Sequence, residues 1–101
     1  GTLVGYARTF LPVCDKGLEL TPGRGAILDS RAVARGVTGD LAGAAADLRA
    51  ALAAPAGSFK PEERALRESW LTALGRGENP FTPAVLEDLH YGPLAGLRWG
   101  H

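Results

Sequence analysis

Apolar residues recur at spacings of three and four along several segments of this 101-residue chain, and glycine- or proline-rich breaks separate the segments. The breaks lie at residues 36–39, 54–58 and 75–82. Such spacings place side chains on one face of an α-helix, whereas a half-buried strand needs strict alternation. The pattern predicts an all-α fold: a compact orthogonal or up-down bundle of four to five short helices, with a Gly/Pro-rich loop near the N-terminus.

The clearest segment is the alanine-rich run 40–54. Asp40 is placed to cap its first amides, with Thr38 as an alternative cap, and Pro55 ends the helix. Its apolar stripe consists of Leu41, Ala45, Leu48 and Leu52. Alanine is the best helix former, and its small side chain lets neighbouring helices approach closely. We expect this helix to be central, with helices 59–75 and 83–91 packed on it.

The other segments are less regular. Residues 2–11 favour a helix that ends at Pro12, although Gly5 leaves a strand open, and residues 12–25 are expected to form a loop. Leu18 and Leu20 are expected to reach the core from this loop. A helix over 26–35 should end at Gly36 in the left-handed conformation. In helix 59–75, the pairs Glu63–Arg67 and Arg64–Glu68 are expected to support an exposed face.

The apolar stripes of these predicted helices indicate which residues form the hydrophobic core. We expect it to contain Phe10, Leu11, Leu28, Leu41, Leu48, Leu52, Leu66, Trp70, Leu74, Leu86 and Leu89.

Composition narrows the class of protein. The length predicts a single helical domain over 1–101, and the absence of methionine suggests a piece of a longer chain. Eleven basic residues balance eleven acidic ones, so the domain has no general attraction to nucleic acid, and no apolar run is long enough to span a membrane. Cys14 is the only cysteine and is expected to be a small buried residue. We expect a cytoplasmic protein.

Chemistry-bearing clusters are weak in this chain. Glu87 and His90 share a helix face, but a helical di-metal site needs a second such motif, and only His101 remains. The glycine-rich turn 21–26 lacks the spacing and the lysine of a phosphate loop. Nothing in the sequence brings Cys14, Asp88 and His90 together. We therefore predict no catalytic residues, no metal and no cofactor, and more weakly no enzyme activity.

Residues 28–52 weakly resemble a helix-turn-helix, with small or apolar residues at Ala32, Gly36 and Val37. A DNA-binding regulator of this kind would contact the backbone through Arg31, Arg35 and Arg49. The second helix offers mainly alanine and acidic residues, which is unfavourable for reading bases.

The C-terminal part of the chain is rich in aromatic and apolar side chains. The candidate partner-binding residues are Phe81, Tyr91, Leu94, Leu97, Arg98 and Trp99. Such residue types dominate protein-interface hot spots. The leading hypothesis is a non-enzymatic helical interaction or regulatory module that binds another protein or a second copy of itself through this segment. A small-ligand or catalytic pocket near Tyr91 is the third alternative.

Overall fold

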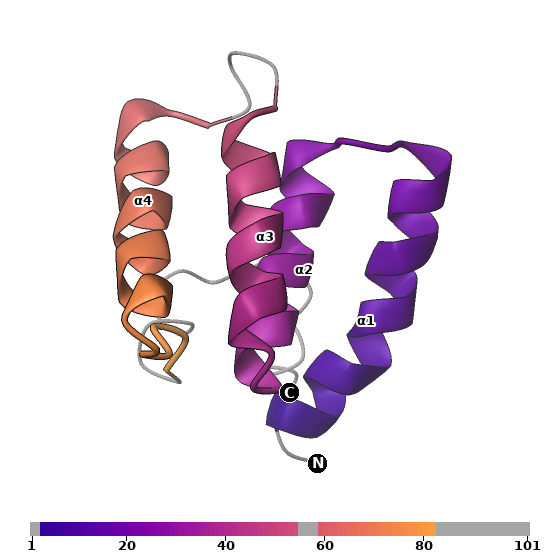
Figure 1. The fold of residues 1–101 in the computed structure, drawn as a ribbon. Coiled ribbons are helices and arrows are strands. Elements are labelled where there is room, and N and C mark those ends of the chain that lie inside the picture. The colour runs from indigo at the N-terminus through magenta and orange to yellow at the C-terminus, as the bar shows by residue number, and fades with distance from the viewer. Residues whose placement is uncertain (1–2, 55–58, 83–101) are drawn as a thin grey trace.

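The computed structural model describes residues 3–54 and 59–82, and these ranges contain four α-helices and no strand. The helices are α1 (Leu3–Leu20), α2 (Gly25–Val37), α3 (Leu41–Leu52) and α4 (Pro61–Gly75). They run alternately up and down, as Figure 1 shows. The predicted all-α bundle of short helices is confirmed, in its up-down form.

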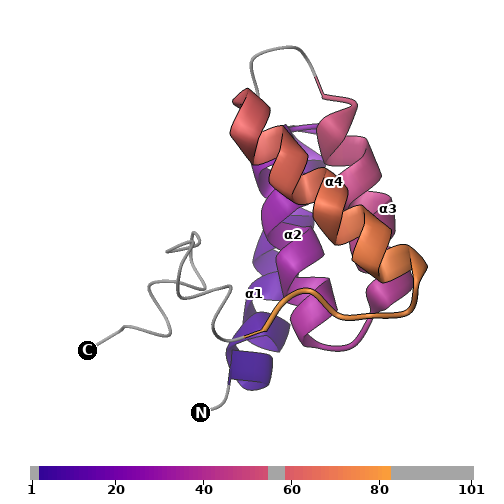
Figure 2. The same ribbon diagram turned by 90° about the vertical axis from the view of Figure 1, so that its left-hand side faces the viewer.

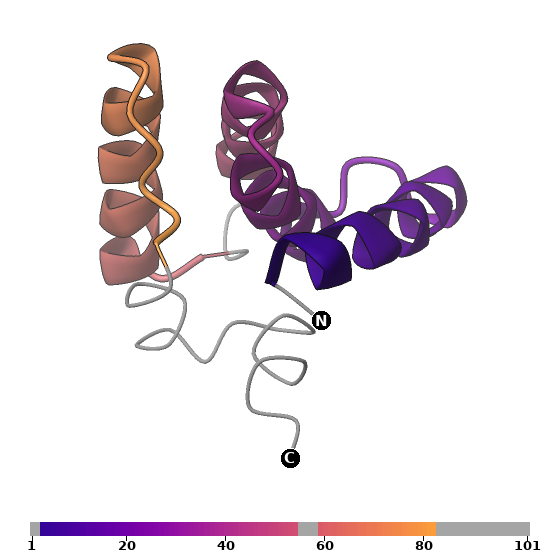
Figure 3. The same cartoon turned by 90° about the horizontal axis from the view of Figure 1, so that it is seen from below.

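Each helix packs on its neighbour in sequence: α1 on α2, α2 on α3, and α3 on α4. Seen from below, α4 and α1 are the two outer helices, and α2 and α3 lie between them (Figure 3). The alanine-rich helix α3 is internal, as predicted, and α4 packs on it. The prediction was incomplete in that α2 is equally internal, because it packs on both α1 and α3.

The prediction that Pro12 ends the first helix and begins a long loop is wrong. Helix α1 continues through Pro12 to Leu20, and the Gly/Pro-rich loop is reduced to residues 21–24. Proline within a helix removes one backbone hydrogen bond and bends the axis, and α1 is bent in Figure 1. Buried Cys14 and half-buried Leu18 lie beyond the proline, and their burial offsets the lost hydrogen bond. Leu20, expected to reach the core, is instead exposed.

The start of α3 and the end of α2 test two predictions made from capping chemistry. The Asp40 carboxylate accepts a hydrogen bond from the Gly43 amide at 2.9 Å, so the predicted N-cap of α3 is confirmed. The prediction that Gly36 ends α2 in the left-handed conformation is wrong, because Gly36 lies inside the helix. The residue with positive φ is Gly39, at 95°, where a side chain would be strained.

The predicted core is largely present. Four of its members are buried: Leu28, Leu48, Trp70 and Leu74. Four more are partly buried and pack against that core: Phe10, Leu11, Leu41 and Leu66. Leu52 is partly exposed, and the predicted helix 83–91 with Leu86 and Leu89 lies outside the described residues.

After α4 the chain turns back to α2 in a short strap, residues 76–82, which Figure 2 shows in orange. Asn79 donates a side-chain hydrogen bond to the Gly36 carbonyl at 2.8 Å, and its Oδ1 accepts from the Phe81 amide at 3.0 Å. The Phe81 ring lies edge-on to Trp70, with centroids 5.1 Å apart. The strap thereby fixes the end of α4 to the C-terminal end of α2.

Gly36→Ala should destabilise the domain, although alanine is the better helix former by about 1 kcal/mol. A Cβ atom at Gly36 would overlap the buried Phe81 ring. The matched control is Gly75→Ala at the end of α4, where an added Cβ meets nothing within 4 Å. Urea unfolding followed by circular dichroism should rank Gly36→Ala below the wild type and Gly75→Ala at or above it. A Gly36→Ala protein as stable as Gly75→Ala would contradict the packing of the strap.

Candidate functional site

A groove of about 330 Å³ lies between α1 and α2. We call it the α1–α2 groove, and it is lined by Phe10, Val13, Cys14, Gly17, Arg24, Ala26, Ile27 and Ser30. Helix α1 supplies the first four residues, at spacings of one, three and four, which places them on one helix face. Most of the lining is apolar, and Arg24 is its one charged residue. A groove of this composition suits an apolar side chain or a helix face.

Apolar residues of α1 remain open to solvent beside the groove. Among the described residues, the exposed large hydrophobic side chains are Val4, Val13 and Leu20, and all three belong to α1. Val13 is 60% exposed and Leu20 is 72% exposed. The positions Phe10, Val13, Gly17 and Leu20 are spaced three, four and three apart and so form one stripe along α1. A continuous apolar stripe of this kind on a helix marks a contact surface more often than scattered exposed residues do.

Gly17 sets how closely the two helices approach in the groove. A Cβ atom there would lie 3.1 Å from Cδ1 of Ile27, so the bare backbone of α1 is what lets Ile27 reach it. Ser30, at the rim, donates its hydroxyl to the Ala26 carbonyl at 3.0 Å. The groove is therefore lined there by the bare Gly17 Cα and by apolar side chains, and its serine hydroxyl is already bonded within α2.

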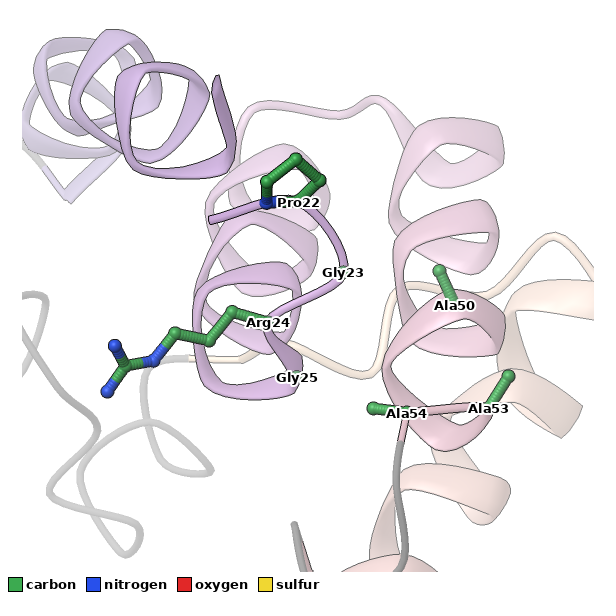
Figure 4. Close-up of a pocket in the computed structure, with 7 residues that line it drawn as sticks. All are labelled: Pro22, Gly23, Arg24, Gly25, Ala50, Ala53 and Ala54. Carbon is green, nitrogen blue, oxygen red and sulfur yellow. The ribbon is translucent and has the colours of Figure 1, made fainter. Parts of the chain in front are cut away.

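A second and larger pocket of about 540 Å³ lies between the 21–24 turn and the end of α3. Its walls are the turn residues Pro22 to Arg24, the first residue of α2, Gly25, and three alanines at and just after the end of α3, Ala50, Ala53 and Ala54. Figure 4 shows the Arg24 guanidinium directed away from these alanines. The glycine-rich turn thus brings no cation into this pocket, which agrees with the sequence-based view of it as a plain turn.

A buried ion pair joins α2 to α4. Arg67 donates to both carboxylate oxygens of Asp29, at 2.9 and 2.7 Å, and its guanidinium lies over the rings of Phe59 and Trp70. Burial raises the pKa of Asp29, while the hydrogen bonds from Arg67 oppose that rise. Arg67 was expected on the exposed face of its helix, beside Glu63. That expectation is wrong, because Arg67 is buried and Glu63 accepts from the Lys60 amide at the start of α4.

A second buried carboxylate, Asp47 of α3, holds two arginines of α2. It accepts from Arg31 at 2.8 and 3.0 Å and from Arg35 at 3.1 Å. Arg31 also donates to Asp15 of α1 at 2.9 Å. The hydrogen bonds that Arg31 donates to Asp47 are the main cause that raises the pKa of Arg31. The network therefore links α1, α2 and α3 through three charged side chains and one surface acid.

The structure does not bring the candidate functional residues predicted from the sequence together in one site. Arg31 and Arg35, proposed for DNA, are bonded to Asp47, and Arg49 is exposed on α3. Phe81, proposed for a partner, is only 4% exposed and belongs to the core. The remaining candidates lie outside the described residues: Tyr91, Leu94, Leu97, Arg98 and Trp99.

The sequence reasoning missed the α1–α2 groove because it ended the first helix at Pro12. The spacing of Phe10, Val13, Gly17 and Leu20 was the available signal. Cys14, predicted to be a small buried residue, is 2% exposed, which confirms that prediction. Among residues 3–54 and 59–82, no group of three or more His, Cys, Asp or Glu side chains is placed to hold a metal ion. In the same residues no helix has the length and apolar character that crossing a bilayer requires.

No protein-family model, curated protein or solved structure matches this chain significantly.

Asp29→Asn should lower the free energy of unfolding by about 3–5 kcal/mol, because it leaves the Arg67 cation buried without its carboxylate. The double variant Asp29→Leu/Arg67→Met should recover much of that loss, since it removes both charges at once. Glu68→Gln, on the exposed face of α4, is the control and should change stability by less than about 0.5 kcal/mol. Urea denaturation of the four proteins measures this, and an Asp29→Asn protein as stable as Glu68→Gln would contradict the buried pair.

Cys14 should react slowly with iodoacetamide in the native protein. Burial raises the pKa of this thiol from 9.0 to about 11, so at mildly alkaline pH its thiolate fraction is about 100-fold below that of the unfolded chain. For the same reason, stability should fall as the pH rises from 9.0 toward 11, where the unfolded thiol ionises first. The comparison protein is Cys14→Ala/Ala46→Cys, with its thiol on the exposed face of α3. Equal labelling rates for the two native proteins would contradict the burial of Cys14.

Proposed function

We propose that this domain is a non-enzymatic helical interaction module that binds an amphipathic helix of a partner protein in the α1–α2 groove. The observation that carries the proposal is the apolar stripe of α1, which remains open at Val13 and Leu20 beside the groove. The described buried acids are used in structural ion pairs with arginine. The proposal therefore rests on a surface and involves no reacting group.

The groove indicates what kind of helix it would accept. Phe10, Val13 and Ile27 offer apolar contact along the direction of α1, which suits apolar side chains of a partner at spacings of three and four. Arg24 at the rim favours an acidic residue beside those side chains. The partner is thus expected to present an amphipathic helix with a short apolar stripe and a flanking carboxylate.

This proposal keeps the class of function expected from the sequence and assigns it a different surface. Binding through residues 91–99 stays a prediction, because those residues lie outside the described part of the chain. The DNA-binding alternative has weaker support, because two of its three arginines are bonded to Asp47. A pocket near Tyr91 also stays a prediction.

A photoreactive benzophenone side chain at position 13, introduced in the source cells, should form a covalent adduct with a partner protein. The same group at position 68, on the exposed face of α4, serves as the matched control. Leu20→Asp should abolish the adduct at position 13, because it places a charge on the apolar stripe, and should leave the fold intact, because Leu20 is exposed. Identical adducts at positions 13 and 68, or no protein adduct at position 13, would contradict the proposal.

A further inference from the structure

We propose that the α1–α2 groove also binds a small amphiphile with one alkyl chain and one carboxylate, which is the chemistry of a medium-chain fatty acid. The inference goes beyond the proposed function, because it adds a small-molecule ligand to the groove that a partner helix would use. Three observations support it: the size of the groove, the polarity of its lining, and the position of its one charged residue.

The size of the groove suits a small ligand. Its volume of about 330 Å³ lies at the lower end of the range for small-molecule sites, which is about 300–1,000 Å³. Along α1 the lining runs from Phe10 to Gly17, which is about 10 Å at the rise of an α-helix. A narrow site of this length between two helices fits a single alkyl chain.

Most of the lining offers nothing to a polar ligand. Phe10, Val13 and Ile27 present hydrocarbon side chains, and the Cys14 thiol behaves as a small hydrophobe with a weak donor. The Ser30 hydroxyl already donates to a carbonyl of its own helix at 3.0 Å. A ligand in the groove therefore gains affinity by burying apolar surface along most of its length.

Arg24 is the one charged residue of the lining, and its guanidinium is available to a ligand. Within residues 3–54 and 59–82 it pairs with no carboxylate, and both acids of α1 have other partners. Asp15 pairs with Arg31 at 2.9 Å, and Glu19 pairs with Lys16 at 3.4 Å. A guanidinium can donate two parallel hydrogen bonds to one carboxylate and balances its single charge. A phosphate monoester carries about −1.5 to −2 and calls for further donors, so the lining favours a carboxylate.

The cation lies at one end of the groove. Arg24 directly precedes α2, whereas Ser30 lies more than a turn further along that helix. Helix α1 runs antiparallel to α2 (Figure 1), so Gly17 lies beside Ile27 near the same end, and Phe10 lies toward the other. The start of α2 has no side-chain cap, and the positive end of its dipole adds to the charge of Arg24 there. The groove therefore favours an anionic head group beside Arg24 and an alkyl chain directed toward Phe10.

The test titrates the purified full chain, with its Val, Leu and Ile methyl groups labelled, with sodium decanoate at concentrations where decanoate is monomeric. The inference predicts saturable NMR shifts of the Val13 and Ile27 methyl signals. Decyltrimethylammonium has the same chain and a cationic head, and it should bind at least about fivefold more weakly. The absence of saturable shifts at these methyl groups, or equal affinity for the two amphiphiles, would overturn the inference. Val13 and Ile27 signals that shift with protein concentration alone would assign the groove to a second copy of the chain and would also overturn it.

Arg24→Gln should weaken decanoate binding about fivefold, because it removes the cation and leaves the apolar lining in place. Arg49→Gln, at an exposed position of α3, is the matched control and should bind decanoate as the wild type does. Circular dichroism should show both variants folded, since both arginines are exposed. Equal decanoate affinity in the wild type and Arg24→Gln would overturn the inference.

The length of the alkyl chain gives a second readout. Hexanoate should bind at least about tenfold more weakly than decanoate, because each methylene that the groove buries raises affinity about fourfold. Equal affinity for hexanoate and decanoate would overturn the inference. None of these measurements uses a partner protein, so a missing partner adduct at position 13 in cells would refute the proposed function alone. A titration without decanoate binding would refute this inference alone.

Discussion

Two buried carboxylates hold this domain together, and both are paired across helices rather than along them. Asp29 of α2 meets Arg67 of α4, and Asp47 of α3 meets Arg31 and Arg35 of α2. Helix α2 is thereby tied to both α3 and α4. A buried charge is costly unless it is paired, so each of these contacts favours one arrangement of the helices over its alternatives. Alanine-rich surfaces alone would allow α3 to slide along its neighbours, because small side chains interlock weakly.

The same arrangement explains why α1 keeps an open apolar stripe. Among the described helices, α1 packs on α2 alone, and a helix can bury only the face that meets its neighbour. Ala7 and Cys14 occupy that face and are buried, whereas Val13 and Leu20 lie on its flank and are not. Asp15, on the opposite flank, reaches Arg31 and so extends the ion-pair network to α1. The groove forms because α1 has one packing partner among the described helices. The apolar residues of α1 cover a wider face than that partner buries.

Local chemistry made much of the fold predictable. Asp40 was recognisable as an N-cap, and the alanine-rich stripe through Leu48 predicted an internal helix, because both signals lie within one segment. The continuation of α1 through Pro12 was not predictable in this way. Proline normally ends a helix, and the burial of Cys14 against α2 that outweighs it is a tertiary effect.

Long-range pairs were the least predictable feature. Asp29 and Arg67 are 38 residues apart, and locally Arg67 had a closer apparent partner in Glu63. The candidate site was missed for the same reason, since the groove exists only when α1 extends past Pro12 and lies beside Ile27. The one local signal was the spacing of Phe10, Val13 and Gly17. A first helix that ended at residue 11 would not contain Val13 or Gly17, so the prediction did not place these residues on one face.

The central claim is that the open stripe of α1 is a contact surface, and methyl NMR of the full chain tests it most directly. With the methyl groups of Val, Leu and Ile labelled, the account predicts that the Val13 and Leu20 signals shift when an amphipathic helical peptide with an apolar stripe and a flanking carboxylate is added. Val13 and Leu20 methyl signals that do not respond to such a peptide would contradict the account.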